Sequence, residues 1–154
     1  MKKMILMRGW SGCGKSYLAR QIADEYNNEC ALTALIHSTD NFFFNKLGKY
    51  EFDGKKLGSA HLWNQSEVRK SMEDGFKVVI VDNTNTMSWE ASVYVSLAKE
   101  YSYEIEVCEP QAEWKFNIDE CAKRNTHGVP RESIQKMMDR WESTEEFKRK
   151  LGIV

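Results

Sequence analysis

The sequence predicts an α/β fold in which a parallel sheet of four or five strands is flanked by helices. Short apolar runs, typical of strands buried on both faces, alternate with longer segments whose apolar residues recur at helical spacing. The clearest run is Val78–Val81, four consecutive branched apolar residues. A glycine-rich turn joins the first run, Met4–Met7, to the first helical segment. This strand and helix order is typical of parallel sheets with right-handed crossovers.

The first half of the chain contains two strands, an irregular segment and two helices. After the first helix, a second strand is expected over 31–36, which is mainly apolar and includes β-branched residues. Residues 41–58 mix aromatics, lysines and three glycines, which indicates an irregular insertion. A helix is expected over 59–74. Its apolar stripe is thin, so part of it is expected to face a polar cleft.

The second half continues the alternation after the Val78–Val81 strand. Ser143 and Glu146 have the spacing of a helix cap and are expected to begin a short terminal turn. The fixed backbone angle of Pro130 suits the first turn of a helix. The other elements are a helix over 87–101, a strand over 103–108, a helix marked by Trp114, Ile118 and Cys121, a loop over 126–130, and a last helix starting at Pro130.

Length and composition predict one compact domain over residues 1–154, since 42% of the residues are hydrophobic. The formal net charge of −1 provides no global attraction for nucleic acid, so contact with a polyanion must come from local lysines and arginines. Four widely spaced cysteines argue against zinc and disulfides, and indicate reduced thiols in a cytoplasmic protein. The apolar run near Met1 is too short for a signal peptide or a membrane span, so no membrane association is expected.

Residues Gly9–Ser16 complete the phosphate-loop (Walker A) pattern G-x-x-x-x-G-K-S. Backbone N–H groups in such a loop point at an anion at the start of a helix. Lys15 is expected between the β- and γ-phosphates, and the Ser16 hydroxyl on Mg²⁺. An accidental glycine-rich turn is the alternative. The pattern therefore predicts a P-loop NTPase-type fold with ATP or another nucleoside triphosphate and Mg²⁺ as cofactors, bound by Gly9, Ser11, Gly12, Cys13, Gly14, Lys15, Ser16 and Tyr17.

Polar residues follow three of the expected strands. The phosphate loop follows the first strand, Asp40 the second, and the segment Asp82–Asn85 the third. Ligands of open α/β sheets bind at the carboxyl ends of the strands. One cleft is therefore expected to hold all three groups.

Further motifs extend over nearly the whole chain. In order they are Ser38-Thr39-Asp40-Asn41-Phe42-Phe43, Tyr50-x-Phe52-Asp53, Ala60-His61-x-x-Asn64-Gln65, Asp82-Asn83-Thr84-Asn85, Trp89-Glu90, Glu109-Pro110 and Arg124-Asn125-x-His127-Gly128-Val129-Pro130-Arg131-Glu132. With the phosphate loop, they resemble the polynucleotide-kinase-like P-loop family. The chain is especially similar to the kinase domain of certain animal ubiquitin-ligase-binding proteins, and more distantly to the bacteriophage 5′-hydroxyl polynucleotide kinase.

The resemblance implies phosphoryl transfer from a nucleoside triphosphate to a hydroxyl, with Asp40 as general base and Lys15 as a catalytic residue. A carboxylate that orients the hydroxyl and takes its proton suits this chemistry; a turn-capping role is the alternative for Asp40. Asp82 follows a buried strand as a Walker B acid does and is expected to hold Mg²⁺. The phage kinase has its aspartate opposite Asn83, so a strand-end hydrogen-bonding role for Asp82 is also considered.

The resemblance also implies a mobile lid that closes over the triphosphate. Arg124 corresponds to a catalytic, nucleotide-binding lid arginine, and Arg131 lies across the same loop. Where the phage kinase has a second lid arginine, this chain has His127-Gly128, so either Arg131 substitutes or the lid has one arginine fewer. The alternative for both is a solvated arginine paired with a nearby carboxylate.

The expected acceptor site combines polar and aromatic residues. The Asn41–Phe44 segment beside Asp40 offers either an aromatic platform or simple packing. The phage kinase has a phosphate-binding arginine near this position, where this chain has phenylalanine. The predicted substrate-binding residues are Asn41, Phe43, His61, Asn64, Asn83 and Asn85.

The leading hypothesis is an ATP- and Mg²⁺-dependent kinase of the 5′-hydroxyl of DNA or RNA, with the nucleic-acid 5′ end as its partner. A kinase of a small molecule, such as a nucleoside or sugar nucleotide, uses the same loop, base and lid. A third hypothesis is a binding module in which ATP orders the lid without transfer. Near-neutral charge leaves open whether an unknown partner protein supplies a grip on nucleic acid.

Overall fold

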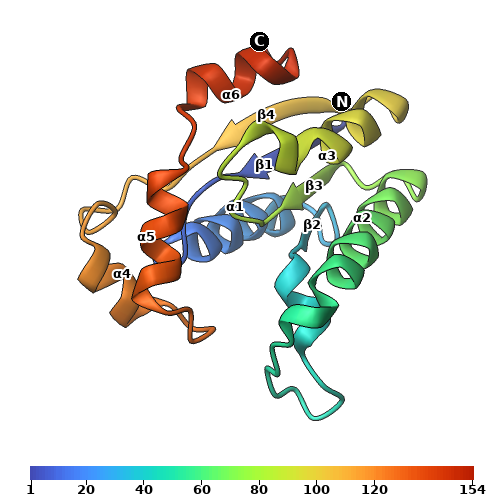
Figure 1. Ribbon diagram of the computed structural model, residues 1–154. Helices are drawn as coiled ribbons and strands as arrows, with labels where there is room; N and C mark the ends of the chain where they lie inside the picture. Colours follow the sequence, from blue (N-terminus) through green and yellow to red (C-terminus); the bar gives the residue numbers. More distant parts are fainter.

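A four-stranded, all-parallel sheet forms the centre of the protein in a computed structural model that describes all 154 residues. Its strands lie side by side in the order β2, β3, β1, β4. Their carboxyl ends point towards the same side of the molecule (Figure 1). The predicted α/β class with helices flanking a parallel sheet is confirmed. The strand bounds are Lys3–Met7 (β1), Ala34–His37 (β2), Val78–Val81 (β3) and Glu104–Cys108 (β4).

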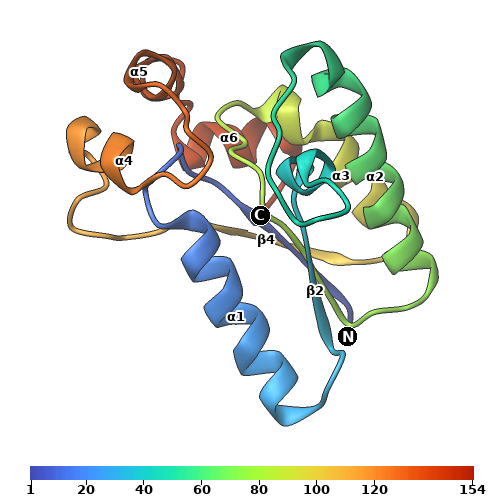
Figure 2. The same cartoon turned by 90° about the horizontal axis from the view of Figure 1, so that it is seen from below.

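Helices cover both faces of the sheet, as Figure 2 shows. Helix α1 (Lys15–Glu29) packs on one face, and α2 (Leu57–Glu73), α3 (Ser88–Glu100) and α6 (Thr144–Leu151) lie on the other. No helix has both the length and the apolar character needed to cross a membrane. The remaining elements are α4 (Ile118–Arg124) and α5 (Arg131–Asp139), beyond the carboxyl ends of the strands, and two 3₁₀ turns, η1 (Thr39–Phe43) and η2 (Gly54–Lys56).

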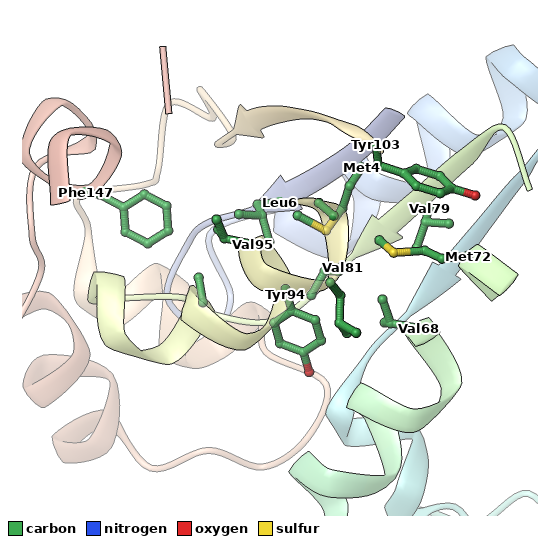
Figure 3. Close-up of a cluster of buried hydrophobic side chains, with 13 residues drawn as sticks. Met4, Leu6, Val68, Met72, Val79, Val81, Tyr94, Val95, Tyr103 and Phe147 are labelled. Carbon is green, nitrogen blue, oxygen red and sulfur yellow. The ribbon is translucent and has the colours of Figure 1, made fainter. Parts of the chain in front are cut away.

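Alternate residues of the two central strands, β1 and β3, pack into two separate cores. In β1, Met4 and Leu6 join Val79 and Val81 of β3 in the larger core, under α2, α3 and α6 (Figure 3). Ile5 and the remaining alternate residues face α1. Successive side chains of a strand point to opposite faces of a sheet. Because both faces of β1 and β3 are covered, these two strands have continuous apolar runs.

Two expected boundaries are wrong by three or four residues because of local polar contacts. The second strand begins at Ala34 rather than 31, since Leu32 has a positive φ of 59° and Asn27 Oδ1 accepts hydrogen bonds from the N–H groups of Thr33 and Ala34, both at 2.9 Å. Helix α4 begins after Asn117, whose side chain accepts from the Glu120 N–H at 3.1 Å. Trp114 therefore lies in the preceding turn.

The predicted cap at Ser143 is present. Its hydroxyl accepts a hydrogen bond from the Glu146 N–H at 3.2 Å, and the helix that it begins, α6, continues to Leu151. A polar side chain at this position satisfies one of the free N–H groups at a helix start. The terminal element is accordingly longer than the short turn that was expected.

Arg8, the residue after β1, is completely buried. Its guanidinium donates to the carbonyls of Asn85 (2.8 Å), Thr86 (3.0 Å) and Glu142 (2.7 Å), and to the Thr144 hydroxyl at 3.0 Å. The guanidinium carbon also lies 4.1 Å and 3.9 Å from the ring centres of Trp141 and Phe147. Burial lowers the pKa of Arg8 to about 10, so the group stays charged at neutral pH. One cation therefore joins the end of β1, the loop after β3, and α6.

Replacing this side chain is expected to destabilise the whole fold. Arg8→Ala removes all four hydrogen bonds and leaves buried carbonyls without partners, which should lower the free energy of unfolding by about 3 kcal/mol or more. Urea unfolding followed by circular dichroism measures the change. Arg69→Ala is the matched control, because Arg69 is half-exposed and pairs with Glu100 at the surface; this substitution should change the free energy of unfolding little. Equal losses for the two variants would contradict the role given to Arg8.

Candidate active site

A large cleft of about 1430 Å³ lies at the carboxyl ends of the strands. Its walls come from parts of the chain that are distant in sequence: the phosphate loop and the start of α1, η1, the loop from β3 into α3, and the region of α4 and α5. Loops at this edge of a parallel sheet form the usual ligand site of α/β proteins.

The phosphate loop runs from the end of β1 into α1 and packs tightly against α4. Gly12 and Gly14 have positive φ angles of 81° and 96°, which residues with a Cβ rarely adopt. A Cβ on Gly12 would lie 1.9 Å from the carbonyl oxygen of Cys121 in α4. The Trp114 indole N–H donates to the Gly12 carbonyl at 2.9 Å. Both the curl of the loop and its contact with α4 therefore depend on glycine.

The other residues of the loop have distinct positions. Ser11, Ser16 and Tyr17 line the cleft, and Tyr17 is exposed. Gly9 donates its N–H to the Thr84 carbonyl at 3.0 Å, which joins the loop to the segment after β3. Cys13 is fully buried behind the loop, and burial raises the pKa of its thiol from 9.0 to about 11. Cys13 thus faces the protein interior rather than the cleft.

Lys15 and Asp82 form an ion pair at the centre of the cleft. Lys15 Nζ lies 2.6 Å from Asp82 Oδ1, and the two side chains are only 11% and 7% exposed. The lysine comes from the first turn of α1 and the aspartate follows β3. The pair connects the neighbouring strands β1 and β3 at their carboxyl ends. Ser16 and Asp82 both line this part of the cleft and supply the oxygen donors that Mg²⁺ prefers.

Asp40, in η1 after β2, lies in the cleft with two neighbours on its carboxylate. The Tyr50 hydroxyl donates to Oδ1 at 3.4 Å, and His127 Nε2 lies 3.6 Å from Oδ2. The tyrosine and histidine rings stack with their centres 4.2 Å apart. Burial and the nearby carboxylate raise the pKa of Tyr50 to about 12, so its hydroxyl keeps its proton. The loop between α4 and α5 therefore reaches the carboxylate directly.

The two arginines predicted for the lid are placed differently. Arg124 lines the cleft; its Nε lies 2.7 Å from Glu120 Oε1, and its guanidinium carbon is 3.7 Å from the centre of the Trp114 ring. Arg131 lies outside the residues that line the cleft and pairs with Asp119 at 2.6 Å. Of the two, Arg124 is the one held beside the phosphate loop.

Two of the six predicted substrate-binding residues line the cleft, three are buried outside its lining, and one is exposed elsewhere. His61 and Asn83 line the cleft. Asn83 accepts from the Thr39 N–H at 2.9 Å and so ties the end of β3 to the residue before Asp40. Asn64 is buried and donates to the Tyr94 hydroxyl at 2.8 Å. The remaining three lie outside the cleft lining: Asn85 is buried and donates to the Met7 carbonyl at 2.8 Å, Phe43 is buried, and Asn41 is exposed.

Tyr50, His127, Trp89 and Arg140 also line the cleft, although the sequence alone predicts no catalytic or binding role for them. Tyr50 and His127 occur in the quoted motifs, but only their contact with Asp40 indicates a function. Trp89 lines the cleft with a side chain that is 71% exposed. Arg140, just after α5, also lines it. A signal for Trp89 was present in the sequence, because it follows the third strand in the motif Trp89-Glu90. No pattern in the sequence indicated Arg140.

A parallel sheet with a phosphate loop between β1 and α1, and an acid at the end of the neighbouring strand β3, defines a P-loop domain of the kinase-like, nucleotide-dependent type. Residues 4–144 match a protein-family model described as "AAA domain", and the chain belongs to this family. It is 39% identical over 139 residues to human NEDD4-binding protein 2; the match covers 90% of this chain and 8% of that protein. The chain thus spans less than a tenth of that relative.

Solved structures of low sequence identity share the fold. A chain from the structure of the Pnkp1/Rnl/Hen1 RNA repair complex matches with a TM-score of 0.66 at 17% identity, over 97% of this chain and 46% of that one. Kti12 from Chaetomium thermophilum, in complex with ADP-AlF3, matches with a TM-score of 0.64 at 16% identity, over 91% of this chain and 80% of that one. These neighbours have the P-loop architecture seen here.

The buried position of Cys13 predicts an inert thiol. A rise in pKa from 9.0 to about 11 lowers the thiolate fraction about 100-fold, and only the thiolate reacts. Iodoacetamide at pH 8 should therefore modify the exposed Cys30 at least on the order of 100-fold faster than Cys13, as measured by mass spectrometry of the peptides. In denaturant the two should react alike. Equal rates in the folded protein would show that the loop opens.

Proposed function

We propose that this domain transfers the γ-phosphate of ATP to the 5′-hydroxyl of a DNA or RNA strand. The observation that carries the proposal is that Asp40 and Lys15 line the same cleft, one after β2 and the other at the start of α1. A carboxylate suited to accept a proton and a lysine suited to hold a terminal phosphate thus face one space. This combination supports phosphoryl transfer to a hydroxyl.

The size of the cleft supports binding of two substrates. Small-molecule pockets commonly enclose about 300–1000 Å³, whereas this one encloses about 1430 Å³. The phosphate loop, Trp114 and Arg124 form the wall suited to the nucleoside triphosphate. The opposite wall contains Asp40, Tyr50, His61 and the start of α3, and there the acceptor would bind.

In the proposed reaction the acceptor oxygen attacks the γ-phosphorus. Its O–H proton moves to Asp40, a new P–O bond forms, and the bond from the γ-phosphorus to the β–γ bridging oxygen breaks to release ADP. Tyr50 donates to one carboxylate oxygen and so orients Asp40. His127 lies against the other oxygen, and its loop has to yield that oxygen to the incoming hydroxyl.

Lys15 has an ion-pair partner that the substrate can replace. With a triphosphate bound, its ammonium would leave Asp82 for the β- and γ-phosphates, and the freed carboxylate could then join the Ser16 hydroxyl in holding Mg²⁺. The ion would neutralise charge on the phosphates. Arg124, beside the loop on Trp114, would exchange Glu120 for phosphate oxygens and act as the lid arginine.

The comparisons support a nucleic-acid acceptor. A chain of an RNA repair complex shares this fold over 97% of the present domain and 46% of its own length. The motifs that resemble polynucleotide kinases, together with Asp40 in the cleft, favour the 5′-hydroxyl of a strand over other hydroxyls.

Asp40→Asn should separate binding from transfer. The amide keeps the shape of the side chain but accepts no proton, so transfer of radiolabelled phosphate to a 5′-hydroxyl hexanucleotide should fall at least about 100-fold. The ATP affinity, measured by calorimetry, should change little. Asp24→Asn is the control, since Asp24 is exposed on α1 outside the cleft. Near-normal turnover of Asp40→Asn would remove this residue from the reaction.

The same assay with a panel of acceptors decides between the alternatives. Transfer to DNA or RNA strands but not to nucleosides or sugar nucleotides supports the proposal. The reverse preference would indicate a small-molecule kinase. Tight ATP binding with no transfer to any acceptor would indicate a nucleotide-dependent binding module.

A further inference from the structure

Trp89 places an open aromatic surface at the acceptor side of the cleft. It lies in the first turn of α3, and its side chain is 71% exposed although it lines the cleft. By contrast, Trp10 is buried, with an edge contact to Trp141 whose ring centre is 5.0 Å away. A large apolar ring left open beside a ligand cleft suits stacking with a nucleic-acid base.

Arg140 places a positive charge beside the same wall. Its Nε donates to the Thr86 hydroxyl at 2.9 Å, which fixes the guanidinium at the start of α3. Thr86 in turn donates to Glu90, the neighbour of Trp89. The cation and the indole are thus anchored to one short segment between β3 and α3.

The charge of Arg140 is free to bind an anion. Four of the six exposed arginines are neutralised by an ion pair with a carboxylate, namely Arg69, Arg124, Arg131 and Arg149. The other two, Arg20 and Arg140, both line the cleft, and Arg140 is the one bonded to the segment that carries Trp89. Arg140 is exposed, lines the cleft and forms no ion pair. A guanidinium with free N–H groups is well suited to a phosphate diester.

The topology places these two residues beyond the reacting groups. Strand β3 lies between β2, which leads to Asp40, and β1, which leads to Lys15. An acceptor hydroxyl between those two side chains therefore lies over the end of β3. The chain continues from there through Thr86 to Trp89, so the rest of an acceptor would pass along this segment as it leaves the cleft.

We infer that Trp89 and Arg140 grip the acceptor strand next to its reacting nucleotide, Trp89 by stacking on a base and Arg140 by binding the first internucleotide phosphate. This inference rests on the proposed function and names the part of the substrate that the site recognises. A strand of two or more nucleotides engages both residues, whereas a mononucleoside offers no internucleotide phosphate. The grip therefore makes acceptor length the determinant of specificity.

The kinetic test compares acceptors of increasing length: a nucleoside, a dinucleoside monophosphate and a hexanucleotide. For the hexanucleotide, Trp89→Ala should raise KM on the order of 10-fold or more with kcat nearly unchanged, and Trp89→Phe should retain most of the affinity. Arg140→Gln should raise KM for the dinucleoside monophosphate and the hexanucleotide. It should also make the plot of the logarithm of the hexanucleotide association constant against the logarithm of the salt concentration less steep by about 0.7, the value for one phosphate contact on a single strand. The nucleoside should respond to neither change.

Matched controls lie away from the cleft. Phe116→Ala removes another exposed aromatic ring, which contacts Trp10, and Arg69→Gln removes a surface cation. Neither should change KM for the hexanucleotide. Thermal unfolding of each variant checks that Arg140→Gln, which loses the bond to Thr86, remains folded; if it does not, the Trp89 variants decide the result alone.

A binding assay distinguishes failure of the grip from failure of the proposed function. Fluorescence anisotropy of a labelled hexanucleotide is measured with a non-hydrolysable ATP analogue present. Binding that is lost in Trp89→Ala supports the grip even if no acceptor is phosphorylated. Hexanucleotide binding and KM that are the same in wild type, Trp89→Ala and Arg140→Gln would overturn the inference while leaving phosphoryl transfer intact.

Discussion

The buried guanidinium of Arg8 is the interaction on which the geometry of the cleft depends. Burying a charge carries a large desolvation cost, which must be offset by hydrogen bonds and nearby charge. Here carbonyl oxygens from the loop after β3 and from the segment before α6 supply that compensation, with two aromatic rings on the cation. Arg8 is also the last residue before the phosphate loop. The start of that loop and the base of α3 are therefore fixed to the same group.

The two walls of the cleft are supported by different means. On one side, the phosphate loop lies against α4 through the contact between Gly12 and Cys121 and the hydrogen bond from Trp114, so the loop and the α4 region are mechanically connected. On the other side, Asn83 holds the η1 segment that carries Asp40. His127, between α4 and α5, reaches across to the η1 side through its contacts with Asp40, Tyr50 and the Phe44 ring. Closure of the site over a nucleotide would act mainly on those contacts.

Elements with a local sequence signal were predicted correctly. The predictions were less precise where contacts between residues distant in sequence determine the position of a side chain. The apolar run Val78–Val81 and the pattern Gly9–Ser16 identified β3 and the phosphate loop because strand burial and phosphate binding each require particular residues in a row. The polar residues Asn64 and Asn85 have the composition expected for a substrate site, yet they are buried and bonded to Tyr94 and to β1. Single-residue chemistry does not distinguish a polar group that faces a ligand from one that satisfies the backbone. Arg140 is the converse case. The role proposed for it in binding the acceptor follows only from its position beside Thr86, 54 positions earlier in the sequence.

The charge balance of the chain bears on the proposed recognition of a nucleic-acid strand. With a formal net charge of −1, the protein has no overall field that would hold a polyanion, and most exposed arginines are already paired with carboxylates. Under the proposed function, affinity for a strand would come from a few directed contacts, in which one cation and one aromatic ring supply electrostatic attraction and stacking. Neither contact reads the edges of the bases, because every base has a face that stacks and every nucleotide has the same phosphate. Such a site would discriminate the end of a strand from a free nucleoside, and it would do so without selecting a nucleotide sequence.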